Sequence, residues 1–175
     1  MRLRFLAAAA GFALLLPAGA GAQPRQYSTE EIAADLAYGF CPLFLADSFS
    51  LTAPQLAERG FAPAIARQQN PRFGEIRMVT AKRADGEVAF GGAAGKVCSV
   101  VVSGNKRGAA LAKLRETMSW TGLDFKPAPH TGAAIQGVKV DTFKAAVDGQ
   151  FLYVQLIETG GPIPAVSAQL FAMKE

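Results

Sequence analysis

Charged side chains are scarce in this sequence: they make up 18% of its 175 residues, whereas half of all residues are hydrophobic. Disordered chains have the opposite balance, with few hydrophobic residues and a high net charge, so this composition indicates a folded protein. The length is that of one ordinary domain, which can bury a sizeable core. We therefore expect a single domain rather than a disordered chain.

The excess of basic over acidic residues is small, and part of it comes from the N-terminal segment. The formal net charge is +4, and Arg2 and Arg4 stand in a segment that we expect to be removed. The basic pairs at 82–83 and 106–107 lack the interleaved aromatic residues that bind single-stranded nucleic acid. We therefore expect no nucleic-acid partner.

Histidine is almost absent, which argues against metal chemistry. The sequence has one, His130, and a zinc site needs three or four ligands such as histidine or cysteine. A Gly-x-Ser-x-Gly elbow, a His-Glu-x-x-His pair and an EF-hand loop are also missing. Gly91–Lys96 resembles a phosphate-binding loop, but Phe90 and Val97 occupy the first and last motif positions. We expect no metal, no cofactor and no catalytic residue.

One enzymatic alternative stays open. Ser103 begins a Ser-x-x-Lys tetrad that ends at Lys106, and His130 has the chemistry of a general base. A small exported hydrolase would need His130 to face a pocket beside Ser103 or another hydroxyl. A strand end followed by a helix cap explains Ser103 equally well.

The first 22 residues have the pattern of a secretory signal peptide. Two arginines precede an apolar run over residues 5–16, a proline breaks the run, and small residues end the segment at Ala22. The run is too short for a transmembrane helix, which needs about 20 apolar residues. We predict cleavage after Ala22, with cleavage after Ala20 as the alternative. The product is one exported α+β domain over residues 23–175 with no membrane span.

Cysteine is also rare. The exported domain keeps two, Cys41 and Cys98, and an oxidising compartment allows such a pair to form a disulfide. We predict a Cys41–Cys98 bridge between the end of the first helix and a central strand, and a periplasmic or secreted location. Two buried free thiols and a redox pair are the alternatives, although a redox site favours Cys-x-x-Cys spacing.

The first helix is predicted by capping and periodicity. Ser28 and Glu31 form a capping box at its start, and apolar residues recur every four positions from Ile32. Gly39 and Pro42 predict its end. The Cys98 side of the central strand is the side that we expect this helix to cover.

Two further helices and a series of strands complete the pattern. One helix is expected from a Thr52 cap to Gly60, and one over 106–119 after an Asn105 cap. Residues 61–74 are interpreted as a connection. Alternating or apolar runs predict strands at 76–78, 87–90, 96–103, 123–126, 135–143, 151–158 and 166–173.

Short links between strands predict the fold class. The Asp-Gly pairs at 85–86 and 148–149 connect neighbouring strands too tightly for parallel crossovers. We predict an α+β fold, with an antiparallel sheet of meanders packed against the N-terminal and central helices. Val97–Gly104 and Tyr153–Gly160 resemble each other, which suggests two αβ-meander pseudo-repeats, although similar strand composition explains the likeness as well.

A binding role is the main functional hypothesis. Because catalytic motifs are missing, the sequence favours a non-enzymatic binding or interaction module of the cell envelope. Its partner would be an envelope protein, a polymer or a small apolar ligand held on a sheet face or groove. Phe143, Phe151 and Tyr153 are candidate contact residues. The alternative function is the small exported hydrolase that uses His130 as general base.

Overall fold

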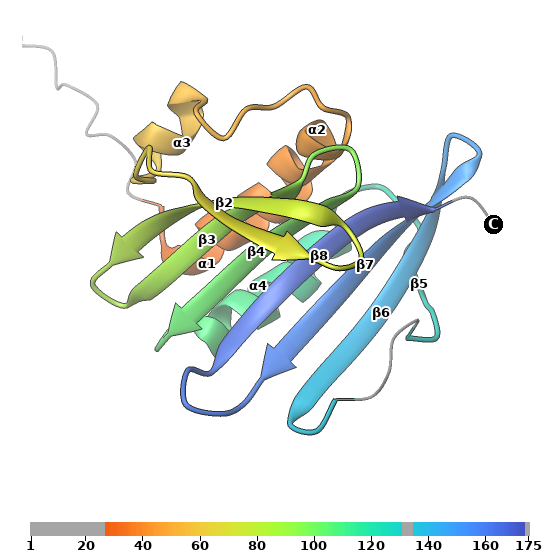
Figure 1. The fold of residues 1–175 in the computed structure, drawn as a ribbon. Helices are drawn as coiled ribbons and strands as arrows, with labels where there is room; N and C mark the ends of the chain where they lie inside the picture. Colours follow the sequence, from red (N-terminus) through yellow and green to blue (C-terminus); the bar gives the residue numbers. More distant parts are fainter. Residues whose placement is uncertain (1–26, 131–134, 174–175) are drawn as a thin grey trace, which may run out of the picture.

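The computed structural model describes residues 27–130 and 135–173, so the predicted signal peptide lies outside the described residues. Within them the chain forms an eight-stranded antiparallel sheet with helices on one face, which confirms the α+β prediction (Figure 1). The strand order is β1-β2-β3-β4-β8-β7-β6-β5, so β4 and β8 meet in the middle. The strands are β1 (Ala66–Asn70), β2 (Gly74–Arg83), β3 (Gly86–Ala93), β4 (Val97–Gly104), β5 (Lys126–Pro127), β6 (Val138–Val147), β7 (Gln150–Thr159) and β8 (Ala165–Met173). The helices are α1 (Thr29–Asp35), the π-helical η1 (Leu36–Phe40), α2 (Cys41–Leu45), α3 (Pro54–Glu58) and α4 (Arg107–Met118).

The first helix runs further than the sequence predicts. The capping box is present: the Glu31 N–H donates to Ser28 Oγ at 3.3 Å, and the Ser28 N–H donates to Glu31 Oε2 at 2.9 Å. The helix does not stop at Gly39, because α1 continues through η1 into α2. The wider π-helical turn places Pro42 in the first turn of α2, where a helix does not require its missing N–H.

Two predicted caps and one predicted connection are wrong. The N-cap residue of α3 is Ala53 rather than Thr52, whose hydroxyl bonds to a neighbouring serine instead. The N-cap residue of α4 is Lys106 rather than Asn105, and no side chain caps this helix. The segment 61–74 contains β1, whose polar and mostly exposed residues show no hydrophobic alternation. Such an edge strand has no periodic signal that could identify it.

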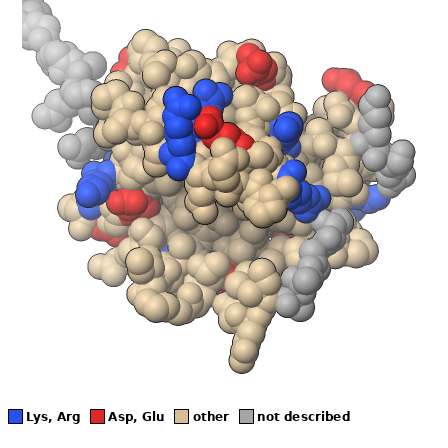
Figure 2. Space-filling model, in the orientation of Figure 1, with Lys and Arg blue, Asp and Glu red and all other residues tan. Residues whose placement is uncertain are grey.

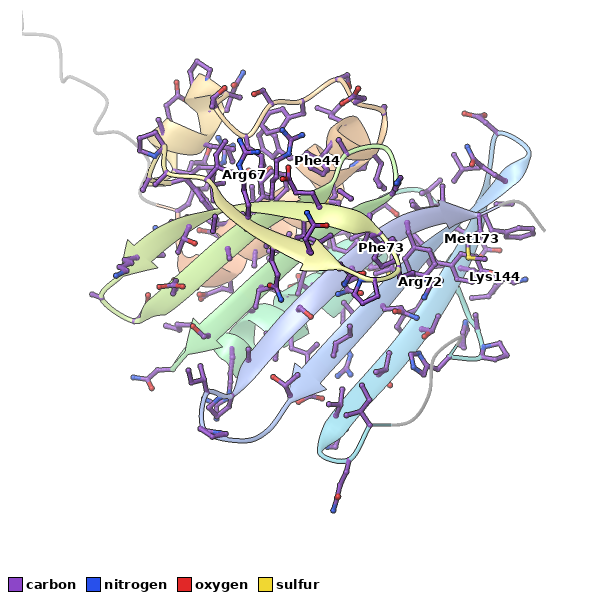
Figure 3. The ribbon with its side chains drawn as sticks, viewed as in Figure 1. Phe44, Arg67, Arg72, Phe73, Lys144 and Met173 are labelled. Atoms are coloured by element: carbon purple, nitrogen blue, oxygen red, sulfur yellow. A yellow bond between two sulfur atoms is a disulfide. The ribbon has the colours of Figure 1, made fainter. Side chains whose placement is uncertain are left out.

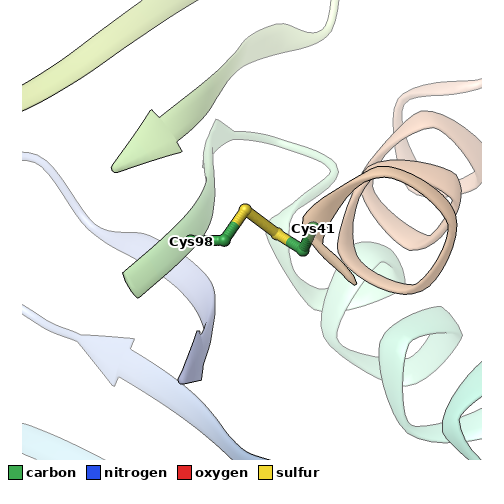
Figure 4. Close-up of a disulfide and its surroundings, with 2 residues drawn as sticks. All are labelled: Cys41 and Cys98. Atoms are coloured by element: carbon green, nitrogen blue, oxygen red, sulfur yellow. A yellow bond between two sulfur atoms is a disulfide. The ribbon is translucent and has the colours of Figure 1, made fainter. Parts of the chain in front are cut away.

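The helices cover the face of the sheet that carries Cys98. The side chains of Cys98, Val100 and Val102 share this face of β4 and are buried, as predicted. The predicted disulfide is present: Cys41, the first residue of α2, is bonded to Cys98, with the two Cα atoms 5.4 Å apart (Figure 4). The bridge therefore joins the helical layer to a central strand. Other buried residues of this core include Ile32, Leu36, Phe44, Val88, Phe90, Leu114, Val154, Leu156 and Leu170.

A half-buried tyrosine connects two helical segments. The Tyr38 hydroxyl of η1 donates to the Leu114 carbonyl of α4 at 2.9 Å. Burial raises the pKa of Tyr38 above its ordinary value, because the phenolate would lose its hydration in the core. None of the helices in the described part of the chain has the length and hydrophobicity that a membrane crossing requires.

The β1–β2 hairpin bends over the face of the sheet that the helices leave uncovered. Phe73, at its tip, packs against a second apolar cluster that includes Val97 of β4 and Phe171 of β8. The Arg72 guanidinium lies 5.8 Å from the centre of the Phe171 ring. Figure 3 shows Arg72 and Phe73 at the hairpin tip, near Met173 at the end of β8. The hairpin therefore forms a wall over one end of this face.

Candidate binding face

We call the side of the sheet opposite the helices the open face. Its side chains come from alternate positions of the strands, because successive residues of a strand point to opposite sides. No helix among the described residues packs on it (Figure 1). Figure 2 shows uncharged side chains across the centre of this face and charged ones toward its margins.

Four polar side chains cross the open face in one line, which we call the polar row. They lie on the adjacent strands β4, β8, β7 and β6, and each is paired with the next in the register: Ser99, Gln169, Gln155 and Thr142. Since neighbouring strands lie about 4.8 Å apart, the row is roughly 14 Å long. On β3, Gly91 stands opposite Ser99, so the row ends beside a position without a side chain.

Much of the hydrogen-bonding capacity of the polar row is unused within the described residues. Gln155 is 6% exposed, and its amide Nε2 lies 3.3 Å from Nδ1 of His130. The Thr142 hydroxyl is buried and has no partner among the described residues. The Ser99 hydroxyl and the Gln169 amide also bond to no group in the described chain. Because buried polar groups are normally hydrogen-bonded, the unpaired groups point to a partner on the face, which reaches the half-buried Ser99 and Gln169 more directly than the buried Gln155 and Thr142.

Apolar side chains border the polar row on both sides. Toward one end of the strands they are Val101, Ile157 and Val140, with Ser167 of β8 between the first two, and toward the other Val97, Phe171 and Tyr153, followed by Lys144 of β6. The rings of Tyr153 and Phe171 are stacked, with their centroids 5.4 Å apart. Phe171 is 3% exposed, whereas Tyr153 is half-buried and reachable from the face. The row is thus a polar line with apolar flanks.

The charged side chains of the open face lie outside the polar row. Lys82 and Glu87 oppose each other on β2 and β3, toward one end of the strands. Lys144 lies on the outer strand β6, with its ammonium 4.3 Å from the centre of the Phe151 ring, and faces Lys126 of β5. The polar row is therefore uncharged, and the charges nearest to it are those of Lys144, paired with Tyr153, and of Arg72, over the Phe171 ring.

The β1–β2 hairpin turns one end of the open face into a cleft of about 320 Å³. Gln68, Asn70 and Phe73 line it from the hairpin. Ser99 and Gln169 of the polar row line it from the sheet. Its volume is at the lower end of the range for ligand sites, roughly 300–1,000 Å³. The polar row therefore leads from the outer strand β6 into this cleft.

Two of the three aromatic residues expected on a binding face lie on the open face. Phe151 and Tyr153 are on it, at alternate positions of β7. Phe143 is not: it is paired with Val154, and it packs against the main core under the helices. Its assignment as a contact residue is wrong, because adjacent residues of a strand point to opposite faces and Thr142 occupies the open side.

The structure does not bring Ser103 and His130 together. His130 contacts Gln155 near the middle of β7, whereas Ser103 is paired with Ala165, which is paired with Thr159 at the end of β7. Four residues of strand, about 13 Å, separate Gln155 from Thr159. The Ser103 hydroxyl is therefore beyond hydrogen-bond reach of the His130 ring.

Two other hollows on the described surface have fewer features of a binding site. One of about 400 Å³ lies beside α2 and is lined by Phe44, Phe49 and Arg77, and another of about 320 Å³ lies near the start of α4. Neither holds a buried polar side chain that lacks a partner. Among the described residues, no three His, Cys, Asp or Glu side chains gather as a metal site would require.

Sequence reasoning missed the polar row, although the strands carry a signal for it. Ser99, Gln155 and Gln169 each stand as a single polar residue between two apolar neighbours in a predicted strand. Such a residue indicates that one face of the strand is not filled by apolar side chains alone at that position. The pattern cannot show that the three positions lie side by side, because that depends on strand order.

Comparison with known proteins leaves the fold and the face as the basis for assigning a function. No family model matches the chain, and no curated protein and no solved structure matches it significantly.

Proposed function

We propose that this protein is a non-enzymatic binding module of the cell envelope, periplasmic or secreted, and that its ligand lies on the open face. The Cys41–Cys98 disulfide supports export, because such bonds persist in oxidising compartments. The predicted signal peptide over residues 1–22 and the exported domain over residues 23–175 are part of this proposal.

The polar row carries the proposal. A sheet face that only stabilises the fold would be filled with apolar side chains and covered, as the helix side is. The open face instead keeps Gln155 and Thr142 buried, and it leaves the Thr142 hydroxyl and the Gln169 amide without partners in the described chain. A ligand that supplies hydrogen bonds would offset the cost of desolvating these groups.

The hydrolase alternative has less support. A general base needs a nucleophile or a water within hydrogen-bond reach of the proton that it takes. Ser103 is too far from His130 to serve, and the Nδ1 atom of His130 faces the Gln155 amide. The arrangement supports a role for His130 in orienting Gln155 rather than in catalysis.

We also infer that the two αβ-meander pseudo-repeats are real. The sheet order is symmetric about its middle, with β1 to β4 on one side and β5 to β8 in mirrored order on the other. Each group of strands has helices before it, α1 and α2 for the first and α4 for the second. This topology makes β8, rather than the segment beginning at Tyr153, the counterpart of β4. The polar row then crosses the junction of the two repeats.

A face-specific capture experiment tests the binding function. The exported protein would be immobilised and exposed to the envelope fraction of its native host. Gln169→Arg places a bulky charge in the middle of the open face, whereas Gln150→Arg places one on β7 away from it. We expect the original protein and Gln150→Arg to retain a component that Gln169→Arg loses. Equal retention by both variants, or no retention by the original protein, would contradict the proposal.

A further inference from the structure

We propose that the ligand of the open face is a neutral polysaccharide chain, laid along the polar row so that successive sugar units contact successive strands. This inference rests on the proposed binding function and specifies the chemical class of the ligand. It follows from four properties of the face: its place within the sheet, its lack of charge, its spacing and its apolar flanks.

The place of the polar row determines how a ligand can be held. The strands β4, β8 and β7 are each paired on both sides, so their backbone groups are used in the ladders. An extended peptide usually adds to a free sheet edge through such groups, and the row offers none. A ligand must bind through Ser99, Gln169 and Gln155. Hydroxyls and carboxamides both donate and accept hydrogen bonds, which matches the hydroxyls of a sugar.

The charge of the face favours a neutral chain. The polar row itself carries no charged side chain. Lys144, which is paired with Tyr153, and Arg72, which lies over the Phe171 ring, are beside the row, and Lys82 and Glu87 lie further out. A charged polymer would lose hydration along the polar row, where no side chain carries an opposite charge. A neutral chain avoids this cost.

The spacing of the row suits a polymer of sugars. Groups on adjacent strands are about 4.8 Å apart, which is close to the length of one pyranose unit in an extended chain. A chain that crosses the strands can therefore bring one sugar to Ser99, the next to Gln169 and the next to Gln155. The cleft under the hairpin receives one end of this path, where the Gln68 side chain adds a further amide.

The apolar flanks complete the match. A pyranose ring presents hydroxyls at its rim and C–H groups on its faces. Val101 and Ile157 on one side of the row, and Tyr153 on the other, lie where such C–H groups would pack. The Tyr153 ring is held by stacking on Phe171, and its hydroxyl has no partner within the described chain. A rigid amphipathic ring of this kind provides contact area at a low entropic cost.

Titration calorimetry with defined probes tests the ligand class. The probes are cellohexaose and chitohexaose as neutral chains, hexagalacturonate as an acidic chain, and a capped, uncharged decapeptide. We expect a neutral hexasaccharide to bind with an affinity that changes little with salt, because no charge pairing is involved. The corresponding disaccharide should bind at least about 10-fold more weakly, since it loses contacts worth more than one hydrogen bond.

Variants locate the binding on the polar row. Gln169→Ala should weaken hexasaccharide binding by about 5-fold, and the Gln155→Ala/Gln169→Ala pair by about 30-fold, as expected for one and two lost hydrogen bonds. Gln150→Ala, on the same strand as Gln155 but away from the open face, should bind as the original protein does.

The outcomes separate the two proposals. The polysaccharide inference is wrong if neither neutral hexasaccharide binds, or if Gln169→Ala binds them unchanged. If hexagalacturonate or the peptide binds instead and depends on Gln169, the binding function stands and only the ligand class is wrong. If no probe and no envelope component depends on Gln169, both proposals fail.

Discussion

The helix-covered face and the open face are built on the same strands, yet their side chains differ in kind. Toward the helices, β4 presents Cys98 and two valines, all fully buried. Toward the open face it presents Val97, Ser99 and Val101, so that a hydroxyl stands between two valines. Packing explains the first arrangement, whereas a polar group on a half-buried face is unfavourable unless it is hydrogen-bonded. The difference supports our proposal that one face stabilises the fold and the other contacts a partner.

Truncating the largest side chain of the covered face should produce the largest loss of stability. Phe90 is fully buried, and its ring packs edge-on against Phe44 and Phe49 with centroid distances of 5.9 and 6.1 Å. Phe90→Ala should lower the free energy of unfolding by about 3–5 kcal/mol, through lost burial and the cavity left behind. Denaturant unfolding measures this loss. A loss below about 1 kcal/mol would show that the covered face is not the main core.

Removing the disulfide should have a similar or smaller effect. Reduction, or the Cys41→Ala/Cys98→Ala pair, should lower the free energy of unfolding by about 2–5 kcal/mol, because the bridge constrains a long loop in the unfolded chain. Thiol titration of the denatured, unreduced protein should find no free thiol. Two titratable thiols would contradict the bridge.

The half-buried Tyr38 predicts a pH dependence of the stability of the covered side. Burial raises its pKa, so above about pH 10 the unfolded chain releases a proton that the folded chain retains. Its contribution to stability is complete below that pH, and it falls by about 1.4 kcal/mol per pH unit above it. Tyr38→Phe should lose about 1 kcal/mol at neutral pH, through the missing bond to Leu114, and should show a flatter alkaline profile. Parallel profiles for the two proteins would contradict this account.

Replacing a polar residue of the open face should separate binding from stability. Gln169→Leu removes an amide that has no partner in the described chain, so the free energy of unfolding should change by no more than about 0.5 kcal/mol. Binding of the ligand should nevertheless weaken by about 5-fold, as expected for one lost hydrogen bond. A large loss of stability would mean that the amide belongs to the core, and the contrast between the two faces would then fail.

His130 and Ser103 should have the smallest effects. We expect Ser103→Ala to leave any activity and binding unchanged, and His130→Ala to change binding by no more than about 5-fold, through a less well oriented Gln155. A general acid or base contributes about 100-fold or more to turnover. A hydrolytic activity that falls by that factor in either variant would establish the enzymatic alternative.

Several features could be predicted because their signals are local. The Ser28–Glu31 capping box begins α1 as expected. Asp148 and Gly149 adopt the positive φ values, 47° and 77°, that an Asp-Gly pair in a tight hairpin requires. The alternation along β4 placed Cys98 on the buried side, and a single cysteine pair allowed one intramolecular bridge. Each of these features depends on neighbouring residues or on a count.

Other features depended on partners far away in the sequence. β1 was missed because a polar edge strand is stabilised by its pairing with β2 rather than by a hydrophobic pattern of its own. Phe143 was placed on the wrong side because the strand could not be assigned a face before its neighbours were known. The continuation of α1 through Pro42 required the π-helical turn, which the sequence did not indicate.

The sequence by itself determined most of the strands, the start of α1 and the disulfide, because capping, turns and cysteine number act over short distances or as totals. The tertiary structure alone decided which residues of the open face lie side by side. Ser99 and Gln169 are far apart in the chain, and they become neighbours because β4 pairs with β8 in the middle of the sheet. The period of a strand specifies which residues share a face, but only packing against the helices decides which strands lie side by side and which face remains open.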